Sequence, residues 1–322
     1  MKILITGATG LLGNHLVRKF APQAEIHALI RRESNKDLIS DYSQEIIWHE
    51  GDLNDIISLE EALKDIDLVI HAAGLVSFNP EDESKLMSVN VKGTANLIDC
   101  MLQFGINKLI HVSSVSALGR SPETKTVNEN QRWIKSDYNT PYAVSKYFAD
   151  LEVWRGVQEG LDAIIVYPSI LLGKISDQRS SSKIYSYVLE GNSYYPKGSV
   201  NYIDVRDAAE LIWQLYQKEV WNEGYILNKE SLPYKIFFEK MSEAFNKKAP
   251  SKEVKKWMLE FVLVFSWIGR KLGISKSPLN KQTAILSQLE VYMDNGKIMN
   301  LLNYNFTPLE QTLSWAKTNE IK

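Results

Sequence analysis

The sequence predicts a doubly wound α/β fold, in which helices cover both faces of a parallel sheet and a smaller, mostly helical lobe follows. Two observations lead to this prediction. Short apolar runs alternate with helix-periodic segments through about residue 170, which is the pattern of βαβ units. The first apolar run also leads through a glycine-rich turn directly into a helix-like segment. At 322 residues, the chain is long enough to bury a large core.

Six strands are expected in the first part of the chain, each an apolar run bounded by turn or helix residues. They span residues 2–6, 25–30, 46–49, 68–71, 108–112 and 163–167. Helices are expected between them at residues 11–20, 59–64, 83–104 and 142–159. In such a sheet, ligands bind beyond the carboxyl ends of the strands.

The turn after the first strand predicts a phosphate-binding site. Gly7 is expected to make the tight turn, Gly10 to let the backbone approach a ligand, and Gly13 to pack the helix on its strand. Backbone N–H groups at the start of a helix bind phosphate. The residues expected to hold a dinucleotide pyrophosphate are Thr6, Gly7, Thr9, Gly10, Leu11, Leu12 and Gly13. An ordinary turn is the alternative, because the G-x-x-G-x-x-G spacing is one residue longer than the common G-x-G-x-x-G fingerprint.

The second strand ends in Arg31-Arg32, where an NAD site would usually place an acidic residue against the ribose 2′-hydroxyl. Guanidinium groups attract a 2′-phosphate instead, so this pair favours NADP over NAD. The alternative is a solvated pair of surface arginines.

The third and fourth strands end in further candidate cofactor residues. Asp52 is expected to accept a hydrogen bond from the adenine amino group while Leu53 packs against the ring, and the alternative is that Asp52 caps the next helix. The fourth strand runs into Ala72, Ala73 and Gly74, whose small size lets a ribose or a phosphate approach the backbone.

The candidate catalytic residues are Ser114, Tyr142 and Lys146. Tyr142 and Lys146 lie four positions apart and are expected on the same face of a helix. A nearby ammonium favours the phenolate form and is expected to lower the pKa of the tyrosine. Tyr142 can then exchange a proton with a substrate oxygen that Ser114 holds by a hydrogen bond. The alternative is a solvated Tyr-Lys pair.

Together these motifs resemble the extended short-chain dehydrogenase/reductase family over essentially the whole chain. The motifs are Thr6-Gly7-x-x-Gly10-x-x-Gly13, Asp52-Leu53, Ala72-Ala73-Gly74, Asn90 in Val89-Asn90-Val91-Lys92-Gly93-Thr94, Ser113-Ser114 and Tyr142-x-x-x-Lys146. The resemblance implies a Rossmann domain with a C-terminal substrate lobe and a Ser-Tyr-Lys set in which Ser114, rather than Ser113, is the serine. It also implies that Tyr167, Pro168 and Ser169, after the sixth strand, contact the cofactor.

Two branches of that family compete. Nucleotide-sugar epimerases and dehydratases usually have an asparagine where this chain has Ser169, and commonly an arginine where it has Asn201. The C-terminal motifs and the Tyr167-Pro168-Ser169 run look more like the dihydroflavonol-4-reductase-like branch. That branch implies an NADP-dependent oxidoreductase, with NAD as the other cofactor considered. The enzyme would reduce a carbonyl, or oxidise a secondary alcohol, on an apolar or aromatic small molecule. The alternatives are an epimerase or dehydratase with bound NAD, and a non-catalytic dinucleotide-binding sensor.

From about residue 170 the sequence pattern changes to longer helical segments separated by glycine, proline and asparagine. We therefore expect an NAD(P)-binding Rossmann domain over residues 1–170 and a substrate-binding lobe over residues 171–322. Late strands near residues 200–204 and 225–227 interleave with the first domain, over about 200–228.

The amino-acid composition limits which partners and which cell compartment are expected for the protein. The 37 Lys and Arg residues nearly balance 39 Asp and Glu residues, so no nucleic-acid partner is expected. No metal site is expected. The single cysteine, Cys100, and a first strand that begins at Lys2 predict a cytoplasmic protein without a signal peptide. The apolar stretch within residues 252–272 is too short to span a membrane, and a lid or a packing helix is favoured over membrane-surface contact. Family resemblance implies a homodimer through the helices at 83–104 and 142–159.

Overall fold

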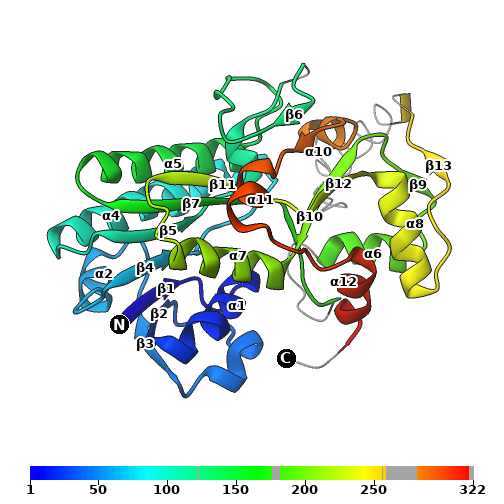
Figure 1. Ribbon diagram of the computed structural model, residues 1–322. Coiled ribbons are helices and arrows are strands. Elements are labelled where there is room, and N and C mark those ends of the chain that lie inside the picture. Colours follow the sequence, from blue (N-terminus) through cyan, green and yellow to red (C-terminus); the bar gives the residue numbers. More distant parts are fainter. Residues whose placement is uncertain (122, 176–181, 256, 259–280, 319–322) are drawn as a thin grey trace.

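A computed structural model of the protein describes residues 1–121, 123–175, 182–255, 257–258 and 281–318. Its centre is a parallel seven-stranded sheet with helices on both faces, which confirms the predicted doubly wound α/β fold (Figure 1). In spatial order the strands are β11 (Glu223–Leu227), β7 (Asp162–Pro168), β5 (Lys108–Val112), β4 (Leu68–His71), β1 (Lys2–Thr6), β2 (Glu25–Ile30) and β3 (Ile46–Glu50).

The helices form two layers, one on each face of this sheet. One layer contains α1 (Leu11–Phe20), α7 (Val205–Gln217) and α11 (Gly296–Leu302), and the other contains α2 (Ile56–Ala62), α4 (Gly93–Gln103) and α5 (Pro141–Gln158). Strand β1 supplies both cores, since Ile3 and Ile5 pack towards α1 whereas Leu4 packs towards α2 and α4. Alternation of this kind explains why a strand buried on both faces reads as an uninterrupted apolar run.

The segment predicted as one helix over residues 83–104 is interrupted. It contains α3 (Glu83–Leu86), a π-helical turn η4 (Met87–Lys92) and then α4. The π-turn carries Asn90, which is buried. The structure also has short 3₁₀ helices, namely η1 (Ala21–Gln23), η2 (Asp37–Tyr42), η3 (Pro80–Asp82) and η5 (Val115–Leu118).

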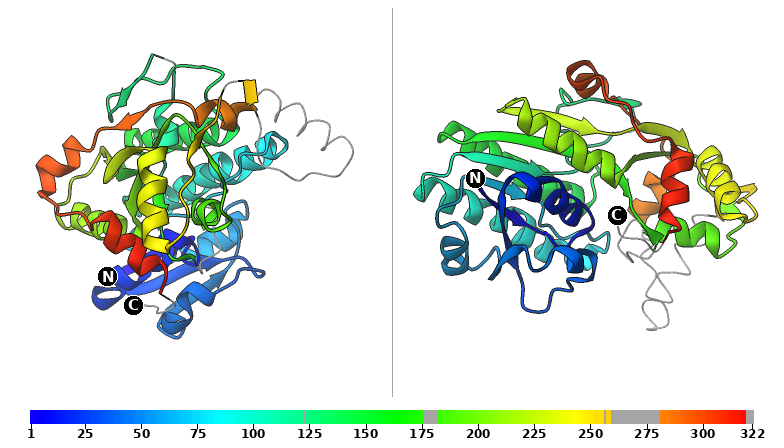
Figure 2. Two further views of the ribbon diagram at one scale, coloured as in Figure 1. Left: turned by 90° about the vertical axis from the view of Figure 1, so that its right-hand side faces the viewer. Right: turned by 60° about the horizontal axis from the view of Figure 1, so that its bottom comes forward.

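The smaller lobe has its own core, between a three-stranded sheet and helices. The sheet contains β8 (Ile170–Leu172), β10 (Ser199–Asp204) and β12 (Glu230–Pro233), and the helices are α6 (Ser182–Leu189), α8 (Tyr234–Phe245) and α12 (Leu309–Ala316). Figure 2 shows α8 and α12 beside each other. Short elements complete the lobe and its border: β6 (Thr126–Val127) with β14 (Tyr292–Met293), β9 (Tyr194–Tyr195) with β13 (Lys252–Glu253), and α10 (Lys281–Leu286).

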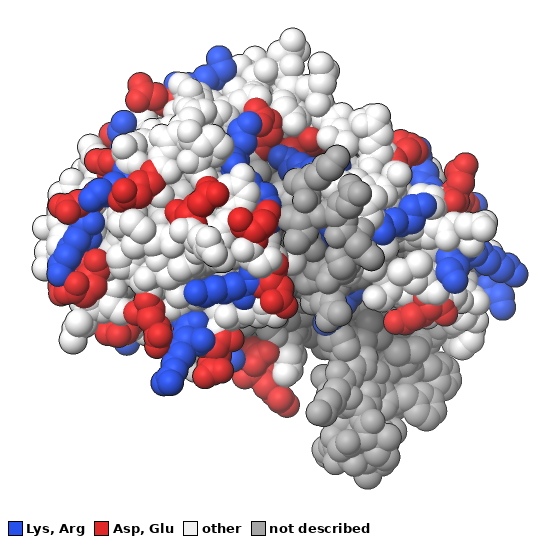
Figure 3. Space-filling view, turned by 90° about the horizontal axis from the view of Figure 1, so that it is seen from below, with Lys and Arg blue, Asp and Glu red and all other residues white. Residues whose placement is uncertain are grey.

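Charged side chains of both signs are interspersed on the face shown in Figure 3, without one large basic patch. Among the helices that the structure describes, none is long and apolar enough to cross a membrane. Most of the stretch at residues 252–272, for which a lid or packing helix was expected, lies outside the described residues.

Candidate active site

The glycine turn has the geometry of a phosphate cradle. Gly7 has a positive φ of +74°, and its carbonyl accepts a hydrogen bond from the N–H of Gly10 at 2.8 Å. A Cβ on Gly13 would lie 2.0 Å from the Gly7 carbonyl oxygen, so only glycine lets α1 start this close to β1. The Asn14 side chain, which sequence reasoning did not single out, donates to the carbonyls of Gly10 and Leu11 at 2.8 and 2.7 Å. The turn is therefore held in place from within α1.

Thr6 joins this turn to the segment after β4. Its carbonyl accepts from the N–H of Ala72 at 3.1 Å, and its Oγ1 accepts from the N–H of Ala73 at 3.2 Å. The same hydroxyl is 2.7 Å from Nδ1 of the buried His71. A Cβ on Gly7 would lie 2.7 Å from the nitrogen of Ala73. The structure thus brings two predicted cofactor segments into direct contact.

Arg31 and Arg32 lie at the end of β2, beside the end of β3, and both are exposed. Neither forms an ion pair with another described residue. Asp52 lies after the neighbouring strand, and its Oδ1 accepts from the N–H of Asn54 at 2.9 Å within the turn before α2, whose N-cap is Asp55, so Asp52 is not the cap of that helix. These positions leave the arginines available to an anionic ligand, and the adenine contact of Asp52 stays a prediction.

Several predicted cofactor residues use their side chains for packing instead. Leu12, Leu53 and Tyr167 are buried in the two cores. The Ser169 hydroxyl donates to the carbonyl of Leu227 in β11 at 3.2 Å. A cofactor could therefore meet the backbone at these positions more readily than the side chains.

The three predicted catalytic residues converge at the N-terminal end of α5. Thr140 caps this helix, because its Oγ1 accepts from the N–H of Ala143 at 3.1 Å. Tyr142 and Lys146 follow in the first two turns, and Tyr142 is hydrogen-bonded to Ser114 at the start of η5. The Lys146 ammonium donates to the carbonyl of Val112 at 2.8 Å.

The pKa of Tyr142 differs in direction from the sequence prediction. Burial disfavours the phenolate and raises the pKa to about 12, although the hydrogen bond from Ser114 acts to lower it. Tyr142 therefore holds its proton at neutral pH. The expected lowering by Lys146 is not what the structure shows, because burial dominates.

Gly74 lies between the predicted cofactor residues and the predicted catalytic residues. A Cβ at Gly74 would lie 3.5 Å from Lys146 Nζ and 3.4 Å from Asn90 Oδ1. The Asn90 amide accepts from the N–H of Leu75 at 2.7 Å and donates to the Ser145 hydroxyl at 2.9 Å. The π-turn thus joins the segment after β4 to α5, and Lys146 lies against that segment.

These features fit a dinucleotide. The cradle at Gly7 and Gly13 has no room for a side chain, helix α1 presents its N-terminus there, and Arg31 and Arg32 lie exposed at the adjacent strand end. Lys146 lies beside Gly74, which follows β4, two strands from β2 in the sheet.

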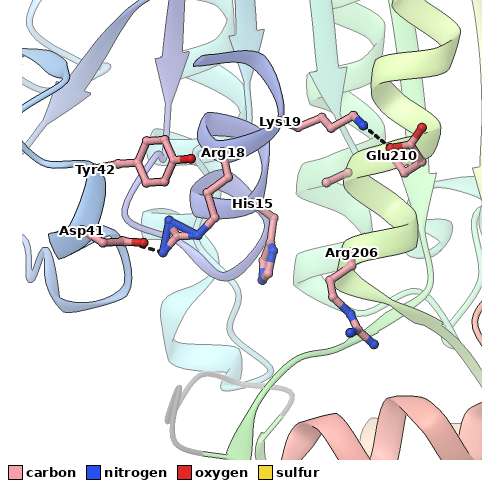
Figure 4. Close-up of a pocket in the computed structure, with 8 residues that line it drawn as sticks. His15, Arg18, Lys19, Asp41, Tyr42, Arg206 and Glu210 are labelled. Atoms are coloured by element: carbon pink, nitrogen blue, oxygen red, sulfur yellow. Dashed lines mark hydrogen bonds and ion pairs between the residues drawn. The ribbon is translucent and has the colours of Figure 1, made fainter. Parts of the chain in front are cut away.

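A cavity of about 490 Å³ lies elsewhere, between α1, η2 and α7 (Figure 4). Its charged side chains are largely paired: Arg18 with Asp41 at 2.7 Å, and Lys19 with Glu210. Because no predicted site residue lines it, we treat it as separate from the catalytic site. Within the described parts of the chain, no group of three or more His, Cys, Asp or Glu side chains could hold a metal ion.

Comparisons with known proteins identify the family of this chain. Residues 3–228 match the NAD dependent epimerase/dehydratase family. A Synechocystis sp. protein named "Putative dihydroflavonol 4-reductase" is 29% identical over 322 residues, covering 97% of this chain and 92% of that protein. "Sterol demethylase protein B" of Methylococcus capsulatus is 30% identical over 239 residues, covering 71% and 70%.

Among solved structures, that of gox2253 is 28% identical with a TM-score of 0.81, covering 98% of this chain and 96% of that one. These matches confirm the resemblance to extended short-chain dehydrogenases/reductases and to their dihydroflavonol-4-reductase-like branch. The chain is an NAD(P)-dependent enzyme that belongs to the NAD dependent epimerase/dehydratase family.

Proposed function

We propose that this enzyme is an NADP-dependent reductase of a carbonyl group on an apolar or aromatic small molecule. The observation that carries the proposal is that Ser114 and Tyr142 are hydrogen-bonded at the start of α5, one helical turn from Lys146. Exposed Arg31 and Arg32 support NADP over NAD. The roles of all these residues rest on the tests described below.

In this mechanism the chain positions a carbonyl and protonates it. The bound cofactor supplies the hydride that reduces the carbonyl carbon. Ser114 donates a hydrogen bond to the carbonyl oxygen, and Tyr142 gives that oxygen its phenolic proton. The product is the alcohol, and Tyr142 is left as a phenolate until solvent returns a proton. The Lys146 ammonium stabilises this phenolate, and it can also reach the ribose hydroxyls of the cofactor.

The rim beside Tyr142 supports an apolar substrate. Phe78, from the loop after Gly74, lies edge-on to Tyr142 with ring centroids 5.9 Å apart and remains 40% exposed. Val76 in the same loop is 45% exposed. Exposed apolar side chains next to polar reacting groups are typical of pockets for apolar ligands. The dihydroflavonol and sterol in the names of the two relatives are of that chemical kind.

The decisive experiment follows NADPH consumption with a panel of ketones and aldehydes in the wild type and in Tyr142→Phe. We expect the variant to lose at least about 100-fold in turnover, in line with removal of a general acid, while NADPH affinity changes little. Tyr147→Phe is the matched control, because Tyr147 lies on the same helix and stacks on Trp133 at 4.1 Å. Retained turnover in Tyr142→Phe would remove this residue from the mechanism.

The same preparations should be offered UDP- and dTDP-sugars. Turnover of a sugar without net change in cofactor, and without carbonyl reduction, would establish the epimerase or dehydratase alternative. Cofactor binding with neither activity would favour the non-catalytic sensor.

We also propose a homodimer in the cytoplasm. Phe148 and Leu151 on α5 are each 42% exposed, and Phe104 at the end of α4 is 40% exposed. Apolar side chains on the adjacent α4 and α5 form a surface that a second copy would cover. Light scattering should give a dimer mass that Leu151→Glu reduces to the monomer, and cell fractionation should recover the enzyme with the cytoplasm. A monomeric wild type would contradict the assembly.

A further inference from the structure

Beneath the catalytic residues lies a polar cluster for which the mechanism has no role. It contains Asp150 on α5 and His111 and Ser113 from the end of β5, all buried. Asp150 follows Lys146 by one helical turn, on the same face of α5. Its Oδ1 lies 3.3 Å from His111 Nε2, and the Ser113 hydroxyl lies against the same carboxyl. This arrangement places a carboxylic acid directly behind the catalytic lysine.

Several polar atoms of this cluster lack hydrogen-bond partners, which is unusual for buried groups with a purely structural role. Asp150 Oδ1 and both ring nitrogens of His111 are buried without an aligned hydrogen-bond partner. Buried polar groups in native proteins are nearly always hydrogen-bonded, since an unpaired one is costly. An apolar residue would fill the space behind Lys146 at lower cost. The retained acid therefore points to a function of its charge.

Asp150 is the acidic group whose charge acts on Lys146 in this region, without a direct ion pair between them. Burial and the nearby Lys146 ammonium hold the pKa of His111 well below its usual range, and burial together with His111 and Lys146 does the same for His71, so both rings are neutral. Burial also lowers the pKa of Lys146, whereas Asp150 acts to raise it. Burial raises the pKa of Asp150, and Ser113 and Lys146 act to lower it. Each charge thus supports the other in a site that excludes water.

We propose that Asp150 is a positioning residue for the proposed reductase reaction, whose buried carboxylate, next to His111 and Ser113, keeps the Lys146 ammonium charged beside Tyr142. The proposal rests on the proposed function in one respect only: the charged lysine matters because it stabilises the phenolate that Tyr142 leaves after donating its proton. The charge pairing of Asp150 and Lys146 can be tested with or without turnover.

The other titratable groups that face Asp150 come from each strand beneath α5. They are His111 from β5, with His71 from β4 behind it at a ring-centroid distance of 5.2 Å, and Tyr167 from β7. On α5 itself Asp150 also raises the pKa of Tyr142. The charged contact that α4 makes with α5 among the described residues, Asp99 with Arg155 at 2.7 Å, lies further along the helix. Only Lys146 among these groups that face Asp150 is a cation at neutral pH.

The primary experiment reads Lys146 directly by NMR titration of protein labelled with ¹³C at lysine Cε, with the Lys146 resonance assigned from Lys146→Arg. Replacing the carboxylate in Asp150→Asn should move the Lys146 midpoint at least about one pH unit lower, which is a tenfold change in the ratio of charged to neutral lysine at a given pH. Asp150→Glu should restore most of the shift. Glu152→Gln is the control, because Glu152 lies two residues further and pairs with Arg155 at 2.8 Å outside the cluster.

The second readout is the pH profile of kcat/KM for carbonyl reduction. In Asp150→Asn, the ratio of kcat/KM at pH 8 to kcat/KM at pH 6 should be about fivefold lower than in the wild type. A Lys146 pKa lowered from about 8 to about 7 reduces the charged fraction of the lysine at pH 8 from about one half to about one tenth. A merely structural defect would lower activity equally at both pH values.

Two results would overturn the proposal: a Lys146 midpoint unchanged in Asp150→Asn, or parallel pH profiles despite a shifted midpoint. If Asp150→Asn does not fold, Ser113→Ala serves in its place. This variant should raise the pKa of Asp150 and shift the Lys146 midpoint in the same direction by a smaller amount, and an unchanged midpoint again counts against the pairing. A shifted midpoint in an enzyme that reduces no carbonyl would instead reject the proposed function while leaving the pairing intact.

Discussion

Replacing Arg31 and Arg32 with alanine should change the cofactor preference of the enzyme. Both guanidinium groups are exposed and without an ion pair among the described residues, so their removal leaves no buried charge behind. The double variant should therefore fold normally, and its effect should fall on the ligand that carries a 2′-phosphate.

The size of the effect follows from that exposure. A hydrogen bond to a charged group contributes about 1.5 to 3 kcal/mol, and exposed groups belong at the lower limit. Two arginines then supply about 3 kcal/mol, which corresponds to about a 100-fold weaker Kd for NADPH. NADH has no 2′-phosphate, so its Kd should change by less than about threefold on the same reasoning. The contrast between the two cofactors is the quantity of interest.

Titrating each protein with NADPH and NADH, followed by nicotinamide fluorescence, measures this contrast. Arg132→Ala is the control, since Arg132 is an exposed arginine outside the predicted cofactor residues. Added salt should weaken NADPH binding to the wild type more than to the double variant. An equal loss of affinity for both cofactors would refute the 2′-phosphate assignment.

Two further predictions concern the helix that follows the glycine turn. Burial, with the cations Arg18, Arg206 and Lys174 nearby, lowers the pKa of His15 from 6.5 to about 4, so the folded state binds fewer protons than the unfolded state between these values. The stability that neutral His15 contributes is thus complete above pH 6.5 and is lost as the pH falls towards 4. Urea unfolding measures the decrease in the free energy of unfolding between pH 7 and pH 5, and this decrease should be smaller in His15→Gln than in the wild type by up to about 2 kcal/mol. An equal decrease in both proteins would contradict the pKa shift. Gly13→Ala should lower the free energy of unfolding by about 1 to 3 kcal/mol and weaken NADPH binding, because its Cβ would lie 2.0 Å from the Gly7 carbonyl oxygen; unchanged urea midpoints would contradict this contact.

The sheet and the glycine turn could be predicted because their signals are local. Buried parallel strands need continuous apolar runs, and the close approach at Gly13 needs glycine, so both leave a direct trace in the sequence. The π-turn leaves no such trace. It depends on Asn90 reaching Leu75 and Ser145, residues distant in sequence, and the apolar pattern of residues 83–104 still looks like one helix.

The electrostatics of the site were the least predictable part. The sequence shows that Tyr142 and Lys146 share a helix face, but the direction of the tyrosine pKa depends on how deeply the surrounding chain buries the hydroxyl. Asp150 has a sequence signal, its spacing of one turn from Lys146, yet that spacing is common on solvated helices. Only the strand beneath it, which brings His111 within 3.3 Å, makes the acid a buried one.

The junction between β10 and α7 restricts how the lobe can move. Asp204 ends the strand and caps the helix, accepting from the N–H of Arg206 at 2.8 Å, and its other oxygen accepts from Thr312 of α12 at 2.8 Å. No loop separates the two elements, and α7 packs along α1, which starts at the phosphate cradle. A hinge needs residues whose backbone angles can change, and no residue lies between the strand and the helix at this junction to serve as one. Closure of the lobe over a ligand would accordingly be a shear between packed helices, and this movement would displace the start of α1.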